Sequence, residues 1–208
     1  MQSRFNRSTE GWAVSGDVAA FGWEPRGGSS RGHLAWTDAA AGSVVYYQAP
    51  DRFEGGKAAY FGGTLSYDIK VSSGSIFASP DVRVTGANGM TLVATVGTPG
   101  TDWTTLSVAL DATGGWRIGD ADGATASNRQ IRRVLKNIEA LEIRAEYIDG
   151  DENGGLDTVT LLKPGQVFGD DRAMLEPASS GDGASLSPVS NMLLARPTRH
   201  AVRRLPVR

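Results

Sequence analysis

The chain contains no cysteine in its 208 residues. Disulfide bonds, thiol nucleophiles and zinc or iron–sulfur sites with cysteine ligands are therefore excluded. Histidine is almost absent, and neither His33 nor His200 has a histidine neighbour at metal-binding spacing. No Ser-His-Asp set can be assembled with a physical rationale, and no glycine-rich nucleotide motif opens a helix. The sequence therefore predicts no enzyme activity.

An excess of one charge is also absent, because 21 Lys and Arg oppose 23 Asp and Glu for a net charge of -2. This balance gives no long-range attraction to nucleic acid, so no nucleic-acid partner is expected. Uncharged stretches fall far short of the about 20 apolar residues that span a bilayer, so no membrane insertion is expected. The start, MQSRFNRSTEGW, has arginines without an apolar run behind them, which predicts no signal peptide.

Glycine, by contrast, is abundant, with 27 residues scattered among 5 Trp, 5 Tyr and 6 Phe. Many short strands joined by tight turns produce this composition. Segment 63–71 alternates strictly, with Leu65, Tyr67 and Ile69 on one face and polar residues on the other, which indicates a half-buried antiparallel strand. The Asn88-Gly89 pair between two alternating runs predicts a hairpin.

About eight strands of this kind are expected, at 11–16, 44–47, 63–71, 81–86, 91–96, 103–110, 141–148 and 156–162. Their number and spacing predict an all-β sandwich or jelly roll. In segment 141–148 the alternation places Glu142, Arg144 and Glu146 on the polar face, opposite Leu141 and Ile143.

One segment follows the helix period instead. Ile131, Val134, Leu135 and Ile138 recur at helical spacing, which predicts a short helix around 128–138. Ser127 followed by Gln130 resembles a capping box. The opposite face carries three arginines and a lysine, and we interpret it as a solvated face rather than a basic docking surface.

The character of the sequence changes after Pro164. Residues 165–208 are rich in Gly, Ser and Pro, have no sustained period, and end with five arginines and no acid from Gly183 onward. We therefore predict a domain over 1–164 and a poorly ordered tail with a basic end over 165–208.

Two further segments contain residues that could bind a ligand. The acidic run 149–157, DGDENGGLD, supplies hard oxygen ligands suited to calcium, but the residues alone favour a solvated turn between two strands. Trp23 and Trp36 lie in a glycine-rich segment, and Tyr46 and Tyr47 adjoin in YYQAPDRF. These four aromatics are candidate ligand contacts, with core packing as the alternative. Alternation sends the two tyrosines to opposite faces, so one is expected in the core.

Several ordered blocks point to a known family. They include VVYYQAPDRFEGGKAAYFGGTLSYDIKV at 44–71, VLKNIEALEIRAEY at 134–147 and GLDTVTL at 155–161. Over about residues 10–162, the chain resembles the laminin B domain (laminin domain IV), in the manner of a bacterial single-domain relative. The resemblance implies an antiparallel jelly-roll sandwich of galactose-binding-like type and no catalysis. It departs from animal members, which are flanked by cysteine-rich modules.

The resemblance also implies a role. It favours a non-catalytic extracellular binding or adhesion module, secreted or at the cell surface, whose partner is a glycan or an extracellular protein. It implies a structural calcium with Asp157 and Asp38 as candidate ligands. The alternatives are a structural, envelope-associated protein that scaffolds a protein partner, a cytoplasmic location, and a glycoside hydrolase with paired carboxylates.

Overall fold

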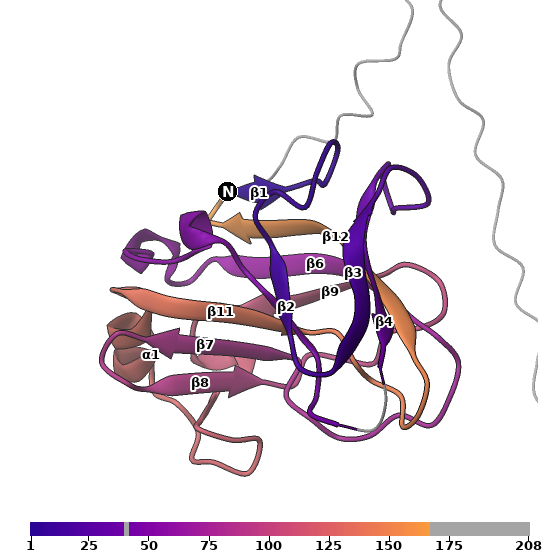
Figure 1. The fold of residues 1–208 in the computed structure, drawn as a ribbon. Coiled ribbons are helices and arrows are strands. Elements are labelled where there is room, and N and C mark those ends of the chain that lie inside the picture. The colour runs from indigo at the N-terminus through magenta and orange to yellow at the C-terminus, as the bar shows by residue number, and fades with distance from the viewer. Residues whose placement is uncertain (40–41, 167–208) are drawn as a thin grey trace, which may run out of the picture. The chain divides into compact units, whose positions relative to one another are not determined.

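The structure, a computed structural model, describes residues 1–39 and 42–166. This part forms two antiparallel sheets that pack face to face, with one α-helix and three short 3-10 helices (Figure 1). The predicted tail, residues 165–208, lies outside the described residues except for its first two positions.

The first sheet, here called sheet A, has the strand order β3-β4-β12-β6-β9, and β1 also pairs with β12. Its strands are β1 (Gln2–Ser3), β3 (Val18–Glu24), β4 (His33–Asp38), β6 (Thr64–Val71), β9 (Thr104–Ala109) and β12 (Asn153–Leu162). The second, sheet B, has the order β10-β8-β7-β11-β5-β2. Its strands are β2 (Ala13–Ser15), β5 (Tyr46–Gln48), β7 (Val82–Gly86), β8 (Thr91–Ala94), β10 (Arg117–Ile118) and β11 (Ile138–Arg144). The predicted all-β antiparallel sandwich is confirmed.

Alternation along the strands builds the core between the sheets. Every second residue of β6 is buried, as its sequence predicts. Leu34 and Trp36 from β4 belong to the same buried cluster as Tyr47 and Ile143 from sheet B. Each of the four is at most 2% exposed. Burial of such side chains stabilises the fold by about 1.5–3 kcal/mol each for the aliphatic ones.

Two adjacent glycines in β12 give tryptophans room on both faces of sheet A. A Cβ on Gly154 would lie 2.8 Å from Nε1 of Trp36 on the core side. A Cβ on Gly155 would lie 2.9 Å from the Trp103 ring on the outer side. The strand can therefore pass between two indole rings only because both positions lack a side chain.

The helix is shorter than its sequence period predicts. It is α1 (Asn128–Leu135), and Ser127 and Gln130 form the expected capping box. Ile138 was expected on this helix but instead begins β11, where it exchanges both backbone hydrogen bonds with Gly55. The last apolar residue of the helical pattern is thus part of a strand, and its side chain is buried there.

Four strands were not predicted, namely β1, β3, β4 and β10. The sequence HLAWTD of β4 does alternate, but the surrounding glycines favour a loop. Those glycines form the β3–β4 connection instead, whose residues 28–30 fold over the outer face of sheet A.

The stretch YYQAPDRF ends a strand as predicted. After β5, Pro50 precedes a 3-10 helix, η1 (Asp51–Phe53), and Phe53 returns to the core with no exposed surface. The other 3-10 helices are η2 (Ala58–Tyr60) and η3 (Ala112–Gly114). No helix in residues 1–39 and 42–166 is long and apolar enough to cross a membrane.

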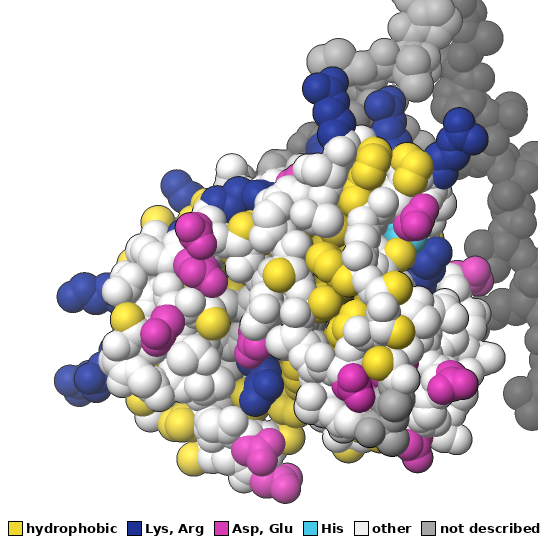
Figure 2. All heavy atoms as spheres, viewed as in Figure 1, with side chains coloured by type: hydrophobic (Ala, Val, Ile, Leu, Met, Phe, Trp, Pro, Cys, Tyr) yellow, Lys and Arg dark blue, Asp and Glu magenta, His cyan; other side chains and the backbone are white. Residues whose placement is uncertain are grey.

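Apolar side chains also reach the surface at one edge of the sandwich. Figure 2 shows them gathered between β2 and β3. Val14, Val18, Phe21 and Trp23 are the partly buried residues that these two strands pack against the core.

Candidate binding site

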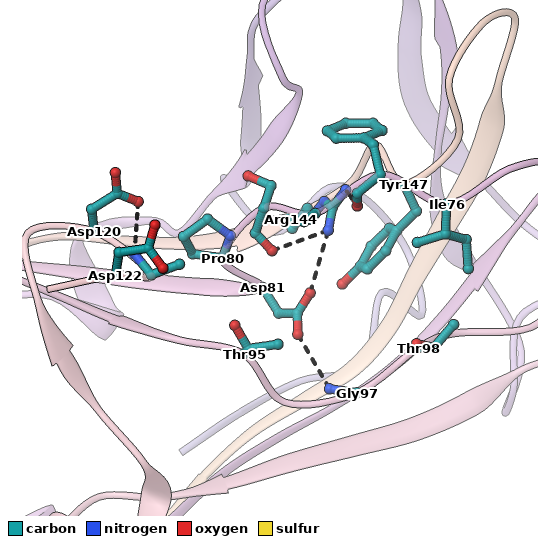
Figure 3. A pocket seen from close by; sticks show the side chains of 14 residues that line it. Ile76, Pro80, Asp81, Thr95, Gly97, Thr98, Asp120, Asp122, Arg144 and Tyr147 are labelled. Carbon is teal, nitrogen blue, oxygen red and sulfur yellow. Dashed lines mark hydrogen bonds and ion pairs between the residues drawn. The ribbon is translucent and has the colours of Figure 1, made fainter. Parts of the chain in front are cut away.

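A pocket of about 490 Å³ opens where β7, β8 and β11 meet the loops at one end of sheet B. Its walls come from residues 76–81, from 95, 97 and 98, and from 120–122, together with Arg144 and Tyr147 (Figure 3). We call it the loop-end pocket. Four segments far apart in the sequence contribute to it, which explains why no single sequence motif announces it.

Arg144 forms the rigid base of this pocket. Its guanidinium lies between the rings of Phe77 and Tyr147, 4.4 and 4.2 Å from their centroids. It donates hydrogen bonds to the backbone carbonyls of Glu146, Ser79 and Phe77, at 2.6, 3.1 and 2.7 Å. A cation held by two rings and three carbonyls has little freedom, so it fixes the loop 77–79.

Asp81 completes the base from the other side. Its Oδ1 lies 3.7 Å from Nη1 of Arg144, and both side chains are almost fully buried. Its Oδ2 accepts hydrogen bonds from the backbone amides of Val96 and Gly97, at 2.5 and 3.2 Å. Both carboxylate oxygens are therefore occupied by the protein, and Asp81 positions the 96–97 segment rather than facing a ligand.

The walls above this base combine apolar and polar groups. Ile76 is 46% exposed and lines the pocket beside Phe77. On the far side stand the exposed carboxylates of Asp120 and Asp122, and Figure 3 shows both to the left of Pro80. Within the described part of the chain, no hydrogen bond engages the Asp122 carboxylate. The pocket thus offers an apolar surface opposite hydrogen-bond acceptors, as sites for small polar ligands do.

A smaller pocket of about 350 Å³ adjoins the YYQAPDRF stretch. It gathers four carboxylates, from Asp51, Glu54, Glu139 and Glu142, and we call it the acidic pocket. Burial raises the pKa of Glu54, and the negative charge of Asp51 adds to this shift. A glycoside hydrolase needs a pair of acids, and candidates line both pockets: these four here, and Asp120 with Asp122 in the loop-end pocket.

The four predicted aromatic contacts do not form a common surface. Trp36 and Tyr47 are 2% and 0% exposed and belong to the core. Tyr46 is on the outer side of sheet B but is 3% exposed, because Arg83 stacks on its ring at 4.8 Å. Its hydroxyl bonds Ser79 and the carbonyl of Pro80. Trp23 is half-buried, and its Nε1 donates to the carbonyl of Phe5.

These positions contradict the interpretation of Trp36, Tyr46 and Tyr47 as exposed ligand contacts. The prediction that one tyrosine is in the core is confirmed for Tyr47. The other faces outward but is covered by neighbours that the local sequence cannot reveal, so alternation alone does not give exposure.

The two candidate calcium ligands lie apart. Asp38 ends β4, whereas Leu156, just before Asp157, pairs with Leu34 near the start of that strand. Asp157 is therefore level with His33, and about five residues of extended chain, roughly 17 Å, separate it from Asp38, so one ion cannot bind both. In residues 1–39 and 42–166, no group of three or more His, Asp or Glu side chains is arranged to hold a metal. Calcium at either residue alone stays a prediction.

Asp157 is fully buried beneath the β3–β4 connection. Its Oδ1 accepts the amide of Thr158 at 2.7 Å. Its Oδ2 accepts the Ser30 amide at 3.1 Å and the Ser29 hydroxyl at 2.9 Å. Burial raises the pKa of Asp157, while these hydrogen bonds oppose the rise. The carboxylate therefore fastens a loop to sheet A.

The acidic run 149–157 divides between a bend at 149–151 and the start of β12, with Glu152 at the junction. Oε2 of Glu152 accepts the backbone amides of Tyr147 and Ile148, at 2.7 and 2.8 Å. Its Oε1 is buried without a hydrogen-bond partner among the described residues. Burial raises the pKa of Glu152 to about 7, although the two amides oppose the rise. The carboxylate thus acts as a local brace for the turn.

The loop-end pocket itself was missed by sequence reasoning. Arg144 was expected on the polar face of its strand, but it is 2% exposed. The strand alternation does point Arg144 away from the core, and the loops cover it from outside. The one available signal was a pair of acids, Asp120 and Asp122, in a glycine-bounded turn before the helix.

The comparisons with known proteins agree with the fold. The family model described as Laminin B (Domain IV) matches residues 46–167. Laminin subunit gamma-2 of Homo sapiens is 31% identical over 176 residues, which is 80% of this chain but 14% of that protein. The basement membrane-specific heparan sulfate proteoglycan core protein of Mus musculus is 26% identical over 60% of this chain and 3% of that protein.

The solved structure of one laminin domain shows the same architecture. The L4b domain of human laminin alpha-2 aligns with a TM-score of 0.52 and 20% identity, over 58% of this chain and 71% of that chain. A family 11 carbohydrate-binding module of a Clostridium thermocellum cellulase aligns with a TM-score of 0.44 and 16% identity, over 78% and 87%. The chain therefore spans a small part of the curated relatives and most of the single modules.

Proposed function

Because the chain belongs to the laminin B (domain IV) family, we propose that it is a non-catalytic binding module whose loop-end pocket takes an uncharged sugar residue. The carrying observation is an apolar wall opposite two exposed carboxylates above a rigid base. The Asp122 carboxylate accepts no hydrogen bond from the described residues, and that of Asp120 accepts one, from the Ala121 amide. A pyranose ring has an apolar CH face and a rim of hydroxyls, and this arrangement suits both.

The charges of the pocket favour a neutral ligand. The arginine at its base is committed to Asp81 and three carbonyls, so its positive charge is already engaged. The groups that face the opening are the carboxylates of Asp120 and Asp122, which accept hydrogen bonds from sugar hydroxyls and repel anions. A rigid base also lowers the entropy lost on binding, because the loops are ordered beforehand.

The proposal places the module outside the cell, in line with two of its relatives, a laminin subunit and a basement membrane proteoglycan. Its partner is then a glycan or a glycosylated extracellular protein. The other hypothesis, a module that scaffolds a protein partner, stays a prediction.

Isothermal titration with neutral oligosaccharides tests the proposal. Asp122→Asn removes a charged acceptor at little change in shape, so the affinity for a bound sugar should fall about 10-fold. Asp102→Asn is the matched control, because Asp102 is exposed and lies outside the pocket. Equal affinities for the two variants, or no binding of any neutral glycan, would contradict the assignment.

The same preparation tests catalysis. The acidic pocket holds the paired carboxylates that hydrolysis would need. We expect no release of reducing ends from glycans on prolonged incubation. Release that Glu54→Gln abolishes would show a glycoside hydrolase instead.

A further inference from the structure

A second pocket of about 490 Å³ lies beside the loop-end pocket and has the opposite charge. Its lining includes Arg83 from β7 and Arg133 from α1, and no acidic side chain. We call it the arginine pocket. The turn at Asn88 and Gly89, and Thr91 of β8, complete its polar surface.

The two arginines differ in how they are held. Arg83 stacks on Tyr46 and lies 4.0 Å from Glu142, which steers its guanidinium without a close ion pair. Arg133 is exposed and has no hydrogen bond or ion pair with any described residue. Guanidinium groups bind carboxylate and sulfate oxygens in a bidentate manner, so the pocket has unused capacity for an oxyanion.

The helix presents its other cations differently. Arg132 lies over the Phe61 ring at 3.7 Å, and Arg129 does not line the pocket. Only one guanidinium of α1 therefore turns toward the β7–β8 hairpin.

The two pockets are lined by neighbouring residues. Gly119 lines the arginine pocket, and Asp120, the next residue, lines the loop-end pocket. On β7 the same holds for Asp81 and Arg83, two residues or about 7 Å apart. One polymeric ligand can therefore occupy both.

We propose that the arginine pocket is an oxyanion subsite, which takes a carboxylate or sulfate group of the glycan whose uncharged residue occupies the loop-end pocket. The ligand class is thus an acidic glycan, with an uncharged residue next to an anionic one. The acids of the loop-end pocket repel the anionic residue, and the arginines attract it, so the charge pattern fixes the direction of the chain. This inference rests on the proposed function only for the uncharged sugar residue, which occupies the loop-end pocket.

Affinity measurements with three oligosaccharides of equal length test it: a neutral galactan, an oligogalacturonate and a heparin fragment. One of the two anionic probes should bind more tightly than the neutral one, and raised ionic strength should reduce this advantage. The oligogalacturonate and heparin arms distinguish a carboxylate from a sulfate as the preferred group.

Arg133→Gln should lower the affinity for the preferred anionic probe about 10-fold and leave the affinity for the neutral probe unchanged. Arg129→Gln is the matched control, since it removes the same charge from the same helix outside the pocket. An equal effect of the two substitutions would overturn the proposal, because it would show general electrostatic attraction. Anionic probes that bind no tighter than galactan would overturn it as well.

The two proposals can fail separately. If galactan binds through Asp122 and neither anion adds affinity, the subsite is wrong and the sugar pocket stands. If an anionic probe depends on Arg133 while Asp122→Asn has no effect on any probe, the subsite stands and the sugar pocket is wrong.

Discussion

The outer faces of the two sheets differ in what covers them. On sheet A, the β3–β4 connection lies over Asp68 and Asp157, and Ser29 bonds both carboxylates. Trp103 lies over Gly155, donates to the carbonyl of Gly27, and stands between His33 and Lys70. On sheet B, three pockets open along the face and its ends.

The difference shows where a ligand could bind. The polar groups of sheet A are used by the protein itself, because its carboxylates accept hydrogen bonds from the connection and from Thr105 and Thr158 of the sheet. The pockets along sheet B keep Asp122 and Arg133 free of protein partners in the described part of the chain. A face whose polar groups are hydrogen-bonded within the protein stabilises the fold, and a face with unpaired polar groups can bind a ligand.

Breaking the base of the loop-end pocket should have the largest effect on stability. Arg144→Met leaves Asp81 buried without its cation, which should cost about 3–5 kcal/mol in the free energy of unfolding. Denaturant unfolding measures this change. The double variant with Asp81→Asn should recover part of the loss, because the uncompensated charge is gone. A loss below about 1 kcal/mol would show that the pair does not hold the loops.

Two buried carboxylates at β12, Glu152 just before the strand and Asp157 within it, should respond oppositely to amide substitution. Both donors to Glu152 share one oxygen, so Glu152→Gln keeps both hydrogen bonds and removes a buried charge. At pH 8 the variant should gain up to about 3 kcal/mol in stability.

The pH dependence has a definite sign. The pKa of Glu152 is raised to about 7 from 4.5, so the folded state binds more protons between these values. Its contribution to stability is complete below pH 4.5 and is lost as the pH rises to about 7. Thermal melts across this range should show a decline that Glu152→Gln flattens, and an unchanged profile in the variant would contradict the assignment.

Asp157→Asn should destabilise instead. Its two amide donors, from Thr158 and Ser30, use different oxygens, and asparagine offers one. The side-chain NH2 group of the asparagine then faces one of the two backbone N–H donors, which should cost about 1–3 kcal/mol in the free energy of unfolding. Denaturant unfolding at neutral pH measures this, and a gain in stability would show that charge removal outweighs the lost bond.

The smallest expected change in stability tests how closely Trp103 packs on the outer face of sheet A. Gly155→Ala places a Cβ 2.9 Å from Trp103 and should destabilise by about 1–2 kcal/mol with a change in tryptophan fluorescence. Gly22→Ala on β3 is the control, because its Cβ would meet nothing within 4 Å. Equal melting temperatures for the two variants would mean that Trp103 does not pack closely on β12.

The sequence predicts the local parts of this fold well. Alternation identifies β6 and the β7–β8 hairpin, and Ser127 with Gln130 identifies the start of α1. These elements depend on residues close in the chain, so a local pattern is sufficient.

Long-range contacts explain what the sequence could not predict. Ile138 leaves the helix because Gly55 pairs with it, and Tyr46 is covered because Arg83 and Ser79 lie over it. Arg144 has a polar strand position, yet loops more than 60 residues away bury it. The candidate site consists of such contacts, which leave no periodic signal in the sequence.

Amide chemical-shift mapping with a neutral oligosaccharide tests the central claim most directly. We predict shifts for the amides of Ile76, Gly97 and Ala121 around the loop-end pocket, and none for Gly27, Ser30 and Gly155 on the covered face of sheet A. Shifts confined to the second group would contradict the account, because the ligand would then bind the face that the protein covers itself.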